Sequence, residues 1–146
     1  MKLKFFPNTQ FFDPDKSEPK DEIGDVGKEI RILSKRRPDL YLRVKSFLKS
    51  LKKIVDISVY IRSKQIYKFP KEYDGLYEMR IPKQAQGGVF RIYFCISEMN
   101  FQMLMLLCAE LKHKTEPKKL DLAFSKMKFY KELVKQGIMQ WNVIKF

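Results

Sequence analysis

The chain has 146 residues, a length typical of one domain with a buried core, and 45% of them are hydrophobic, which excludes a disordered protein. Its 30 lysines and arginines outnumber 17 acidic residues and give a formal net charge of +13. This excess favours a polyanionic partner, namely nucleic acid, an acidic membrane surface or an acidic protein. The alternative is a protein that is basic for solubility alone.

The cysteine and histidine content limits which metal sites and disulfides are possible. Cys95 and Cys108 lie in apolar runs and are expected to be buried free thiols of a reducing compartment. Together with the single His113 they are too few for a structural zinc site, and we predict neither a metal nor another cofactor. No run reaches the roughly 18 apolar residues of a membrane span, and Pro7 interrupts the apolar start. We therefore expect a soluble cytoplasmic protein without a signal peptide.

The first elements in chain order are a strand, a loop and a helix. KLKFF is predicted to be an edge strand, and the stretch FFDPDKSEPKDEIGD, rich in Pro, Asp and Glu, is predicted to be an exposed loop, so residues 1–25 form an irregular front. Val26, Ile30 and Leu33 have helical spacing, and this pattern stops at Pro38.

A second helix follows directly. Its predicted buried stripe consists of Leu40, Val44, Phe47, Leu48, Leu51 and Val55. The opposite side carries Lys45, Lys49, Lys52 and Lys53. Such a lysine face is either simply solvated or a binding surface, and the pattern leaves both open.

From residue 57 the period changes to that of strands. ISVYI and QIYKF are predicted as short strands, one of which could instead be extended loop. YEMRI and VFRIYF alternate and are predicted to pair as an antiparallel hairpin around Gly87 and Gly88. FQMLMLL is apolar on both faces, as a central strand would be.

The last predicted elements are a helix and a tail. Pro117 suits the first turn of the helix. The buried stripe of that helix is predicted to be Leu120, Ala123, Phe124, Met127 and Val134. Residues 137–146 are a tail that could pack as a last strand or as a peptide arm.

We predict one α+β domain over residues 1–146, with a small antiparallel sheet, two N-terminal helices on one face and a C-terminal helix. The other sheet face is expected to stay partly open.

An anion site is predicted on that open face. Arg91 and Tyr93 are two residues apart on one strand and therefore point to the same side. Arg80 on the neighbouring strand and the LKHKTEP segment after the central strand could converge there. The result would be a cluster of hydrogen-bond donors without an acidic pair or a set of metal ligands.

These residues also carry a family resemblance. GLYEMRI is followed by G-x-FRIYF, an apolar strand, a basic K-x-K-T turn, and PKKLDLA leading into a helix with Tyr130. In this order and spacing the chain, over roughly residues 40–133, resembles the RelE/ParE toxin superfamily of bacterial type II toxin–antitoxin systems. It is most similar to the phage-derived HigB-like branch of that superfamily.

The resemblance implies a fold like that of small microbial ribonucleases and a metal-independent endoribonuclease that cleaves mRNA on the ribosome and so inhibits translation. It also implies a cognate antitoxin, either acidic or with a helix-turn-helix. By position, Arg91 matches the arginine that contacts the scissile phosphate, and Arg80 matches a second basic strand residue. The chain departs from the family in its Leu-Lys-His-Lys-Thr turn, and in Glu78, which stands where some catalytic members have lysine.

The predicted site residues follow from this match and from the chemistry. The predicted catalytic set is Arg91, Tyr93, Lys112, His113 and Lys114, and the predicted RNA-binding set is Arg80, Lys83, Lys126 and Tyr130. Metal-free RNA cleavage needs removal of the 2′-OH proton, stabilisation of the phosphate charge and protonation of the leaving oxygen.

Each role has a simpler alternative. A guanidinium matches phosphate oxygens, but Arg91 could instead pair with a carboxylate such as Glu78. An imidazole titrates near neutral pH, but His113 could be a surface residue of a basic turn. Tyr93 could stack on a base or could simply pack on the sheet.

Three functions remain open at this point. The first is a ribosome-dependent mRNA endonuclease toxin. The second is a non-catalytic member of the superfamily that binds a protein target, as ParE proteins bind DNA gyrase. The third is a plain nucleic-acid-binding module.

Overall fold

The computed structural model describes residues 1–6, 24–82, 88–97, 102–112 and 118–136. Its centre is a five-stranded sheet in the order β1-β5-β4-β3-β2. The strands are β1 (Lys2–Phe5), β2 (Ile66–Lys68), β3 (Tyr77–Ile81), β4 (Val89–Ile96) and β5 (Met103–Lys112). Neighbouring strands are antiparallel, except that β1 runs parallel to β5. The predicted α+β class is confirmed.

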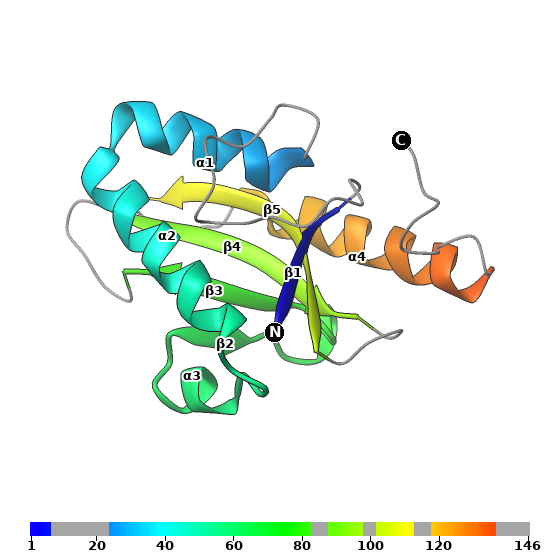
Figure 1. The fold of residues 1–146 in the computed structure, drawn as a ribbon. Helices are drawn as coiled ribbons and strands as arrows, with labels where there is room; N and C mark the ends of the chain where they lie inside the picture. The colour runs from blue at the N-terminus through cyan, green and yellow to red at the C-terminus, as the bar shows by residue number, and fades with distance from the viewer. Residues whose placement is uncertain (7–23, 83–87, 98–101, 113–117, 137–146) are drawn as a thin grey trace.

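Helices cover both faces of this sheet (Figure 1). α1 (Gly24–Arg36) and α2 (Pro38–Lys52) pack on one face, and α4 (Leu120–Lys135) packs on the other. The first core includes Val26, Ile30, Leu33, Val44, Leu48, Leu51, Met79, Ile92 and Phe94. The second includes Leu76, Tyr93, Cys95, Met105, Leu107, Cys108, Ala123, Met127 and Tyr130. The single sheet therefore separates two hydrophobic layers.

The two N-terminal helices lie where the apolar spacing predicts them. α1 ends before Pro38, which takes a first-turn position of α2, where a missing N–H costs no helical hydrogen bond. α2 ends at Lys52, earlier than the predicted stripe requires. Val55 lies beyond the helix and is 72% exposed, so its assignment to the core was wrong.

One predicted strand is a helix. ISVYI forms α3 (Ser58–Arg62), five residues long. The Asp56 carboxylate accepts hydrogen bonds from the Ser58 backbone N–H and hydroxyl, which favours a helical first turn. Tyr60 packs edge-on against Phe47 of α2 and donates its hydroxyl to Ser50. Tertiary packing thus overrides the strand-like alternation of this segment, whereas QIYKF does form β2 as predicted.

The predicted hairpin and central strand are confirmed. β3 and β4 pair antiparallel, with Ile81 opposite Phe90. β5 lies between β1 and β4 and is buried over most of its length. Residues 83–87, which include most of the predicted turn and Lys83, are outside the described part of the chain, as are Pro117 and the tail 137–146.

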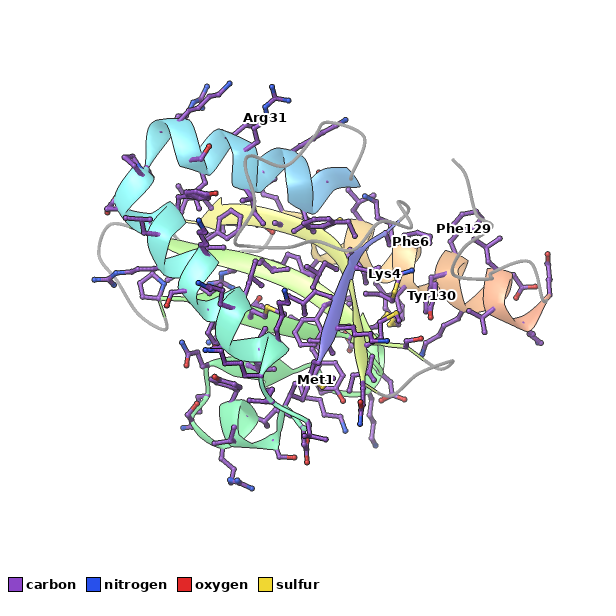
Figure 2. The ribbon with its side chains drawn as sticks, viewed as in Figure 1. Met1, Lys4, Phe6, Arg31, Phe129 and Tyr130 are labelled. Atoms are coloured by element: carbon purple, nitrogen blue, oxygen red, sulfur yellow. The ribbon has the colours of Figure 1, made fainter. Side chains whose placement is uncertain are left out.

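The sheet face that was expected to be open is covered at one end by α4. Tyr130 of α4 is fully buried, and its ring packs edge-on against Phe6, with centroids 5.8 Å apart (Figure 2). Phe129 makes a similar contact with Phe6 at 6.2 Å. α4 therefore closes the β1 side of this face. Among the described residues no helix is long and apolar enough to cross a membrane.

Candidate anion-binding site

The register of the sheet brings the predicted arginines together. Arg80 of β3 and Arg91 of β4 are directly opposite each other, and Arg91 is in turn opposite Glu110 of β5. Directly paired residues share one sheet face. In the adjacent row Glu78 is opposite Tyr93. The prediction that Arg80 converges with Arg91 on the face away from α1 and α2 is therefore confirmed.

A buried carboxylate holds both arginines. Glu78 is 1% exposed and accepts hydrogen bonds from Arg80 Nε at 2.5 Å and from Arg91 Nη1 at 3.3 Å. A carboxylate can be buried in this way because two charge-assisted hydrogen bonds compensate its desolvation. The alternative pairing of Arg91 with Glu78 is thus present in the structure. It fixes the positions of both guanidinium groups.

Arg91 is less exposed than an open-face residue would be. Its side chain is 19% exposed, against 34% for Arg80. The guanidinium has five N–H donors, and one bond to Glu78 leaves most of them available. Its buried Nε has no hydrogen-bond partner among the described residues. Arg91 therefore retains donor capacity for a ligand that approaches from the open end of the face.

Tyr93 does not take the position expected of a base-stacking residue. Its side chain is fully buried, and its hydroxyl donates a hydrogen bond to Glu110 Oε2 at 2.9 Å. Burial, then the nearby Glu78 carboxylate and the bond to Glu110, raise the pKa of Tyr93 far above its ordinary value. The phenol stays protonated at physiological pH, so the sheet-packing alternative describes Tyr93.

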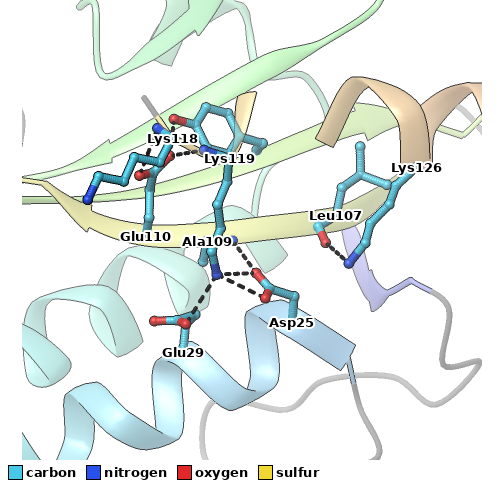
Figure 3. A network of polar contacts seen from close by, with 9 residues as sticks. Asp25, Glu29, Leu107, Ala109, Glu110, Lys118, Lys119 and Lys126 are labelled. Carbon is cyan, nitrogen blue, oxygen red and sulfur yellow. Dashed lines mark hydrogen bonds and ion pairs between the residues drawn. The ribbon is translucent and has the colours of Figure 1, made fainter. Parts of the chain in front are cut away.

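Two predicted RNA-binding residues of α4 lie away from Arg91. Tyr130 is buried and its hydroxyl shares a 2.8 Å hydrogen bond with Ser97, so no surface of its ring is offered to RNA. The Lys126 ammonium donates to the Leu107 carbonyl oxygen at 3.4 Å (Figure 3). Leu107 lies at the irregularity in the β4–β5 pairing and is not paired with a residue of β4. Both residues thus attach α4 to the sheet.

Glu110 connects the site to the start of α4. Its carboxylate accepts the backbone N–H groups of Lys118 at 3.2 Å and Lys119 at 2.9 Å, as well as the Tyr93 hydroxyl (Figure 3). These two N–H groups precede the first residue of α4, and a carboxylate at this end of a helix complements the helix dipole. Glu110 is 7% exposed and so is a structural acceptor with all of its bonds directed inward.

A second set of carboxylates neutralises Lys119. Its ammonium lies 2.9 Å from Asp25 and 3.1 Å from Glu29, both on α1 (Figure 3). Burial alone would lower the pKa of Lys119, but the bonds and charges of these carboxylates outweigh it and raise that pKa. Asp25 also accepts the Ala109 backbone N–H, beyond the residues at which β1 pairs with β5. This cluster joins α1, β5 and the start of α4, and its charges are paired with one another.

Lys112 is the one residue of the predicted basic turn that the structure describes. It ends β5 opposite Val89, two residues from Glu110 and therefore on the same face as Arg91. His113 and Lys114 lie outside the described residues, so their predicted catalytic roles stay predictions.

One aromatic residue of this face was missed by sequence reasoning. Tyr67 of β2 is opposite Glu78 and so shares the face of the two arginines. It is 40% exposed, and the Arg80 guanidinium carbon lies 5.2 Å from its ring centroid. The alternation of QIYKF, with Ile66 buried and Tyr67 outward, carries the signal. This alternation places Tyr67 on the arginine face only once the register of β2 with β3 is known.

The charges of the site are more balanced than the overall composition suggests. Among the described residues of β3, β4 and β5, this face carries three cationic side chains, Arg80, Arg91 and Lys112, and two anionic ones, Glu78 and Glu110. A hollow of about 280 Å³ lies beside Glu110. Its lining includes Arg36 and the exposed Lys118, and it reaches Leu33 and Phe90 of the core on the α1 side of the sheet. Another hollow, of about 570 Å³, lies between α2 and α3 on the side of the sheet that α1 and α2 cover.

Among the described residues, no group of three or more His, Cys, Asp or Glu side chains is placed to hold a metal ion. Comparison of the chain with protein-family models, curated proteins and solved structures found no match.

Proposed function

We propose that the protein is the toxin of a type II toxin–antitoxin pair and cleaves mRNA on the ribosome. The observation that carries the proposal is the pairing of Arg80 with Arg91 on one sheet face, both positioned by the buried Glu78. Lys112 adds a third cation to that face. The element order, with two helices, an antiparallel meander and a last helix, also agrees with the fold that the resemblance implies.

The reaction in this proposal uses the RNA itself as nucleophile. The 2′-oxygen attacks the adjacent phosphorus, the bond to the 5′-oxygen breaks, and a cyclic phosphate and a free 5′-hydroxyl result. The phosphate gains negative charge at the transition state, where a fixed guanidinium is worth more than in the ground state. Arg91 takes this role because Glu78 holds it in place before the substrate arrives.

Proton transfer falls to the residues that follow Lys112 in the sequence. Tyr93 is excluded as a base because its hydroxyl is buried and its pKa is raised. An imidazole suits both removal of the 2′-OH proton and protonation of the leaving oxygen. We assign this role to His113, directly after Lys112, with Lys114 as a further cation.

The proposed function requires a partner that neutralises the toxin. A cationic surface of this kind is best covered by a segment rich in Asp, Glu and apolar residues. The antitoxin of this proposal therefore carries such a segment, beside or in place of a helix-turn-helix domain. A short neighbouring reading frame with this composition would support the pairing.

The test is inducible expression of the protein followed by primer extension on a translated reporter mRNA. We expect growth arrest and cleavages that appear only when the mRNA is translated. Because Arg91→Ala would leave the buried Glu78 with a single partner, the decisive comparison is Glu78→Gln against Glu78→Gln/Arg91→Gln. Loss of one such donor typically lowers a rate about 10²–10³-fold, and we expect this difference between the two variants.

Two further variants sharpen that comparison. Arg91→Lys should retain only part of the activity, since an ammonium keeps the charge but loses the planar fork. Arg62→Gln, an exposed arginine on α3, should cleave like the wild type. Equal cleavage by Glu78→Gln and the double variant would show that Arg91 is structural only.

A non-catalytic, ParE-like protein is the second candidate. Two observations favour it. Glu78 and Glu110 add negative charge to the face, and Tyr93 is buried, so fewer side chains of the face can take part in proton transfer or phosphate binding. This candidate predicts growth arrest with intact mRNA and inhibition of a protein target such as gyrase. The same primer-extension experiment separates the two functions.

A further inference from the structure

An exposed aromatic side chain lies at the open end of the arginine face. Tyr67 is on β2, the outermost strand, and is 40% exposed. The other strongly exposed aromatic among the described residues is Phe129 of α4, which lies against Phe6 where β1 meets α4. Tyr67 is thus the most exposed of the described strand aromatics on the same face as Arg91.

Neighbouring groups hold the Tyr67 ring in place. Phe69 packs against it at right angles, with centroids 4.9 Å apart. The Arg80 guanidinium lies over the ring at 5.2 Å, and its Nε is anchored by Glu78. A cation held over an aromatic ring is attracted by the ring electrons. The two side chains therefore form a layered surface with little freedom to lose when a ligand binds.

The chemistry of this surface fits an unpaired nucleobase. Bases that have left a double helix stack on aromatic rings and on the plane of arginine side chains. Tyr67 is two strands away from Arg91, roughly 10 Å at ordinary strand spacing. A short stretch of extended single-stranded RNA covers such a distance, so one chain can place a phosphate on Arg91 and a flanking base on Tyr67.

We propose that Tyr67 and Arg80 form a stacking platform for a base that flanks the scissile phosphate in single-stranded RNA. This inference rests on the proposed RNA-cleaving function and adds a binding site for the flanking nucleotide. Stacking accepts every base because each has a π-face. The platform therefore positions the strand and does not select its sequence.

The experiment uses the full chain and a short single-stranded RNA oligonucleotide with 2-aminopurine at successive positions. Binding is measured by titration, and stacking by the fall in 2-aminopurine fluorescence at one position. Tyr67→Leu removes the ring and keeps apolar bulk, Tyr67→Phe keeps the ring, and Phe129→Leu removes the other exposed aromatic. Circular dichroism checks that each variant is folded.

We expect Tyr67→Leu to weaken binding roughly tenfold or more, as loss of one stacked base does, and to abolish the local quenching. Tyr67→Phe and Phe129→Leu should bind like the wild type. The salt dependence of binding should not change in Tyr67→Leu, because the side chain carries no charge.

Two results overturn the inference in distinguishable ways. If the wild-type protein binds and cleaves RNA without quenching at any position, or if Tyr67→Leu binds as tightly as Phe129→Leu, the platform is wrong and the proposed function stands. If the wild-type protein binds no RNA and cleaves no translated mRNA, both proposals fail. If Tyr67→Leu does not fold, the wild-type protein still tests the inference, because absence of quenching at every position would overturn it.

Discussion

Glu78 determines how the arginines of the site behave. A carboxylate that is 1% exposed requires charged partners, and β3 and β4 supply one each in Arg80 and Arg91. One carboxylate cannot neutralise two guanidinium groups, so the group as a whole remains cationic. The same contact explains why truncation of Arg91 is a poor test of its role. Removing the guanidinium leaves the buried Glu78 carboxylate with one charged partner in place of two.

The buried thiols allow a prediction at the residue scale. Burial raises the pKa of the Cys108 thiol to about 11, and Cys95 is buried as well. Because the thiolate is the reactive form, both should react very slowly with a thiol reagent at pH 8 in the folded protein and rapidly after unfolding in guanidinium chloride. A stoichiometric reaction of the native protein within minutes would contradict the structure.

The raised pKa of Cys108 also has a consequence for stability. The unfolded chain deprotonates at the ordinary pKa of a thiol, whereas the folded protein keeps the proton to a higher pH. The contribution of the neutral thiol to stability is therefore complete below the ordinary pKa, and it is lost as the pH rises through the raised one.

Sequence alternation predicts the face of a residue but not what covers that face. It correctly puts Tyr93 beside Arg91 on the side away from α1 and α2. It does not reveal that Glu110 accepts the Tyr93 hydroxyl or that α4 covers this end of the sheet. Tyr130 was misassigned for the same reason, because an aromatic residue on a helix has the same spacing whether it faces RNA or a core.

At the scale of elements, the placement of α4 depends on polar groups that are far apart in sequence. Glu110 of β5 accepts the N–H groups that precede α4, and Lys119 joins this point to Asp25 of α1. The helices α1 and α2 could be predicted because their apolar spacing repeats over two or more turns, and β5 because it is an unbroken apolar run. The polar contacts that hold these elements together could not be predicted, since such contacts join residues up to 94 positions apart in the sequence.

α3 provides a prediction at this scale. Asp56 accepts two hydrogen bonds from Ser58, and these bonds lower the pKa of the Asp56 carboxyl. The contribution of Asp56 to α3 is therefore fully present above the ordinary pKa of an aspartate and is lost as the pH falls through the lowered one. The protection factors of the amides of residues 58–62, which correct for the intrinsic exchange rate at each pH, should fall over that range.

Variants at position 56 check this assignment. Asp56→Ala should accelerate exchange of the same amides at neutral pH, because it removes the acceptor at the start of the helix. Asp56→Asn keeps an acceptor oxygen and should remain close to the wild type at every pH. If exchange in Asp56→Ala matched the wild type, the packing of Tyr60 on Phe47 alone would hold α3.

At the scale of the whole molecule, the net charge of +13 is spread unevenly. Carboxylates at Glu78, Asp25 and Glu29 neutralise cations close to the sheet, whereas α2 keeps an exposed basic surface, with Arg43 and Lys49 among its residues. The overall composition predicts attraction to polyanions. It cannot say whether binding depends on a few fixed cations of the sheet face or on the diffuse charge of the helices.

Salt dependence separates these two modes of binding. Each phosphate contact on single-stranded nucleic acid contributes about −0.7 to the slope of log K against log salt concentration. If Arg80, Arg91 and Lys112 make the main contacts, the slope for a short single-stranded RNA should be about −2. Diffuse binding by the many basic residues of the helices would give a much steeper slope.

The variants then assign that slope to residues. Relative to Glu78→Gln, the double variant Glu78→Gln/Arg91→Gln should flatten it by about 0.7, because one phosphate contact is lost. Arg91→Lys should keep the wild-type slope, since the charge remains, while binding more weakly because the fork is gone. Arg62→Gln on α3 should change neither value. If Arg62→Gln flattened the slope as much as the Arg91 change does, the RNA would be bound by the general basic surface of the protein, and the arginine face would lose its special role.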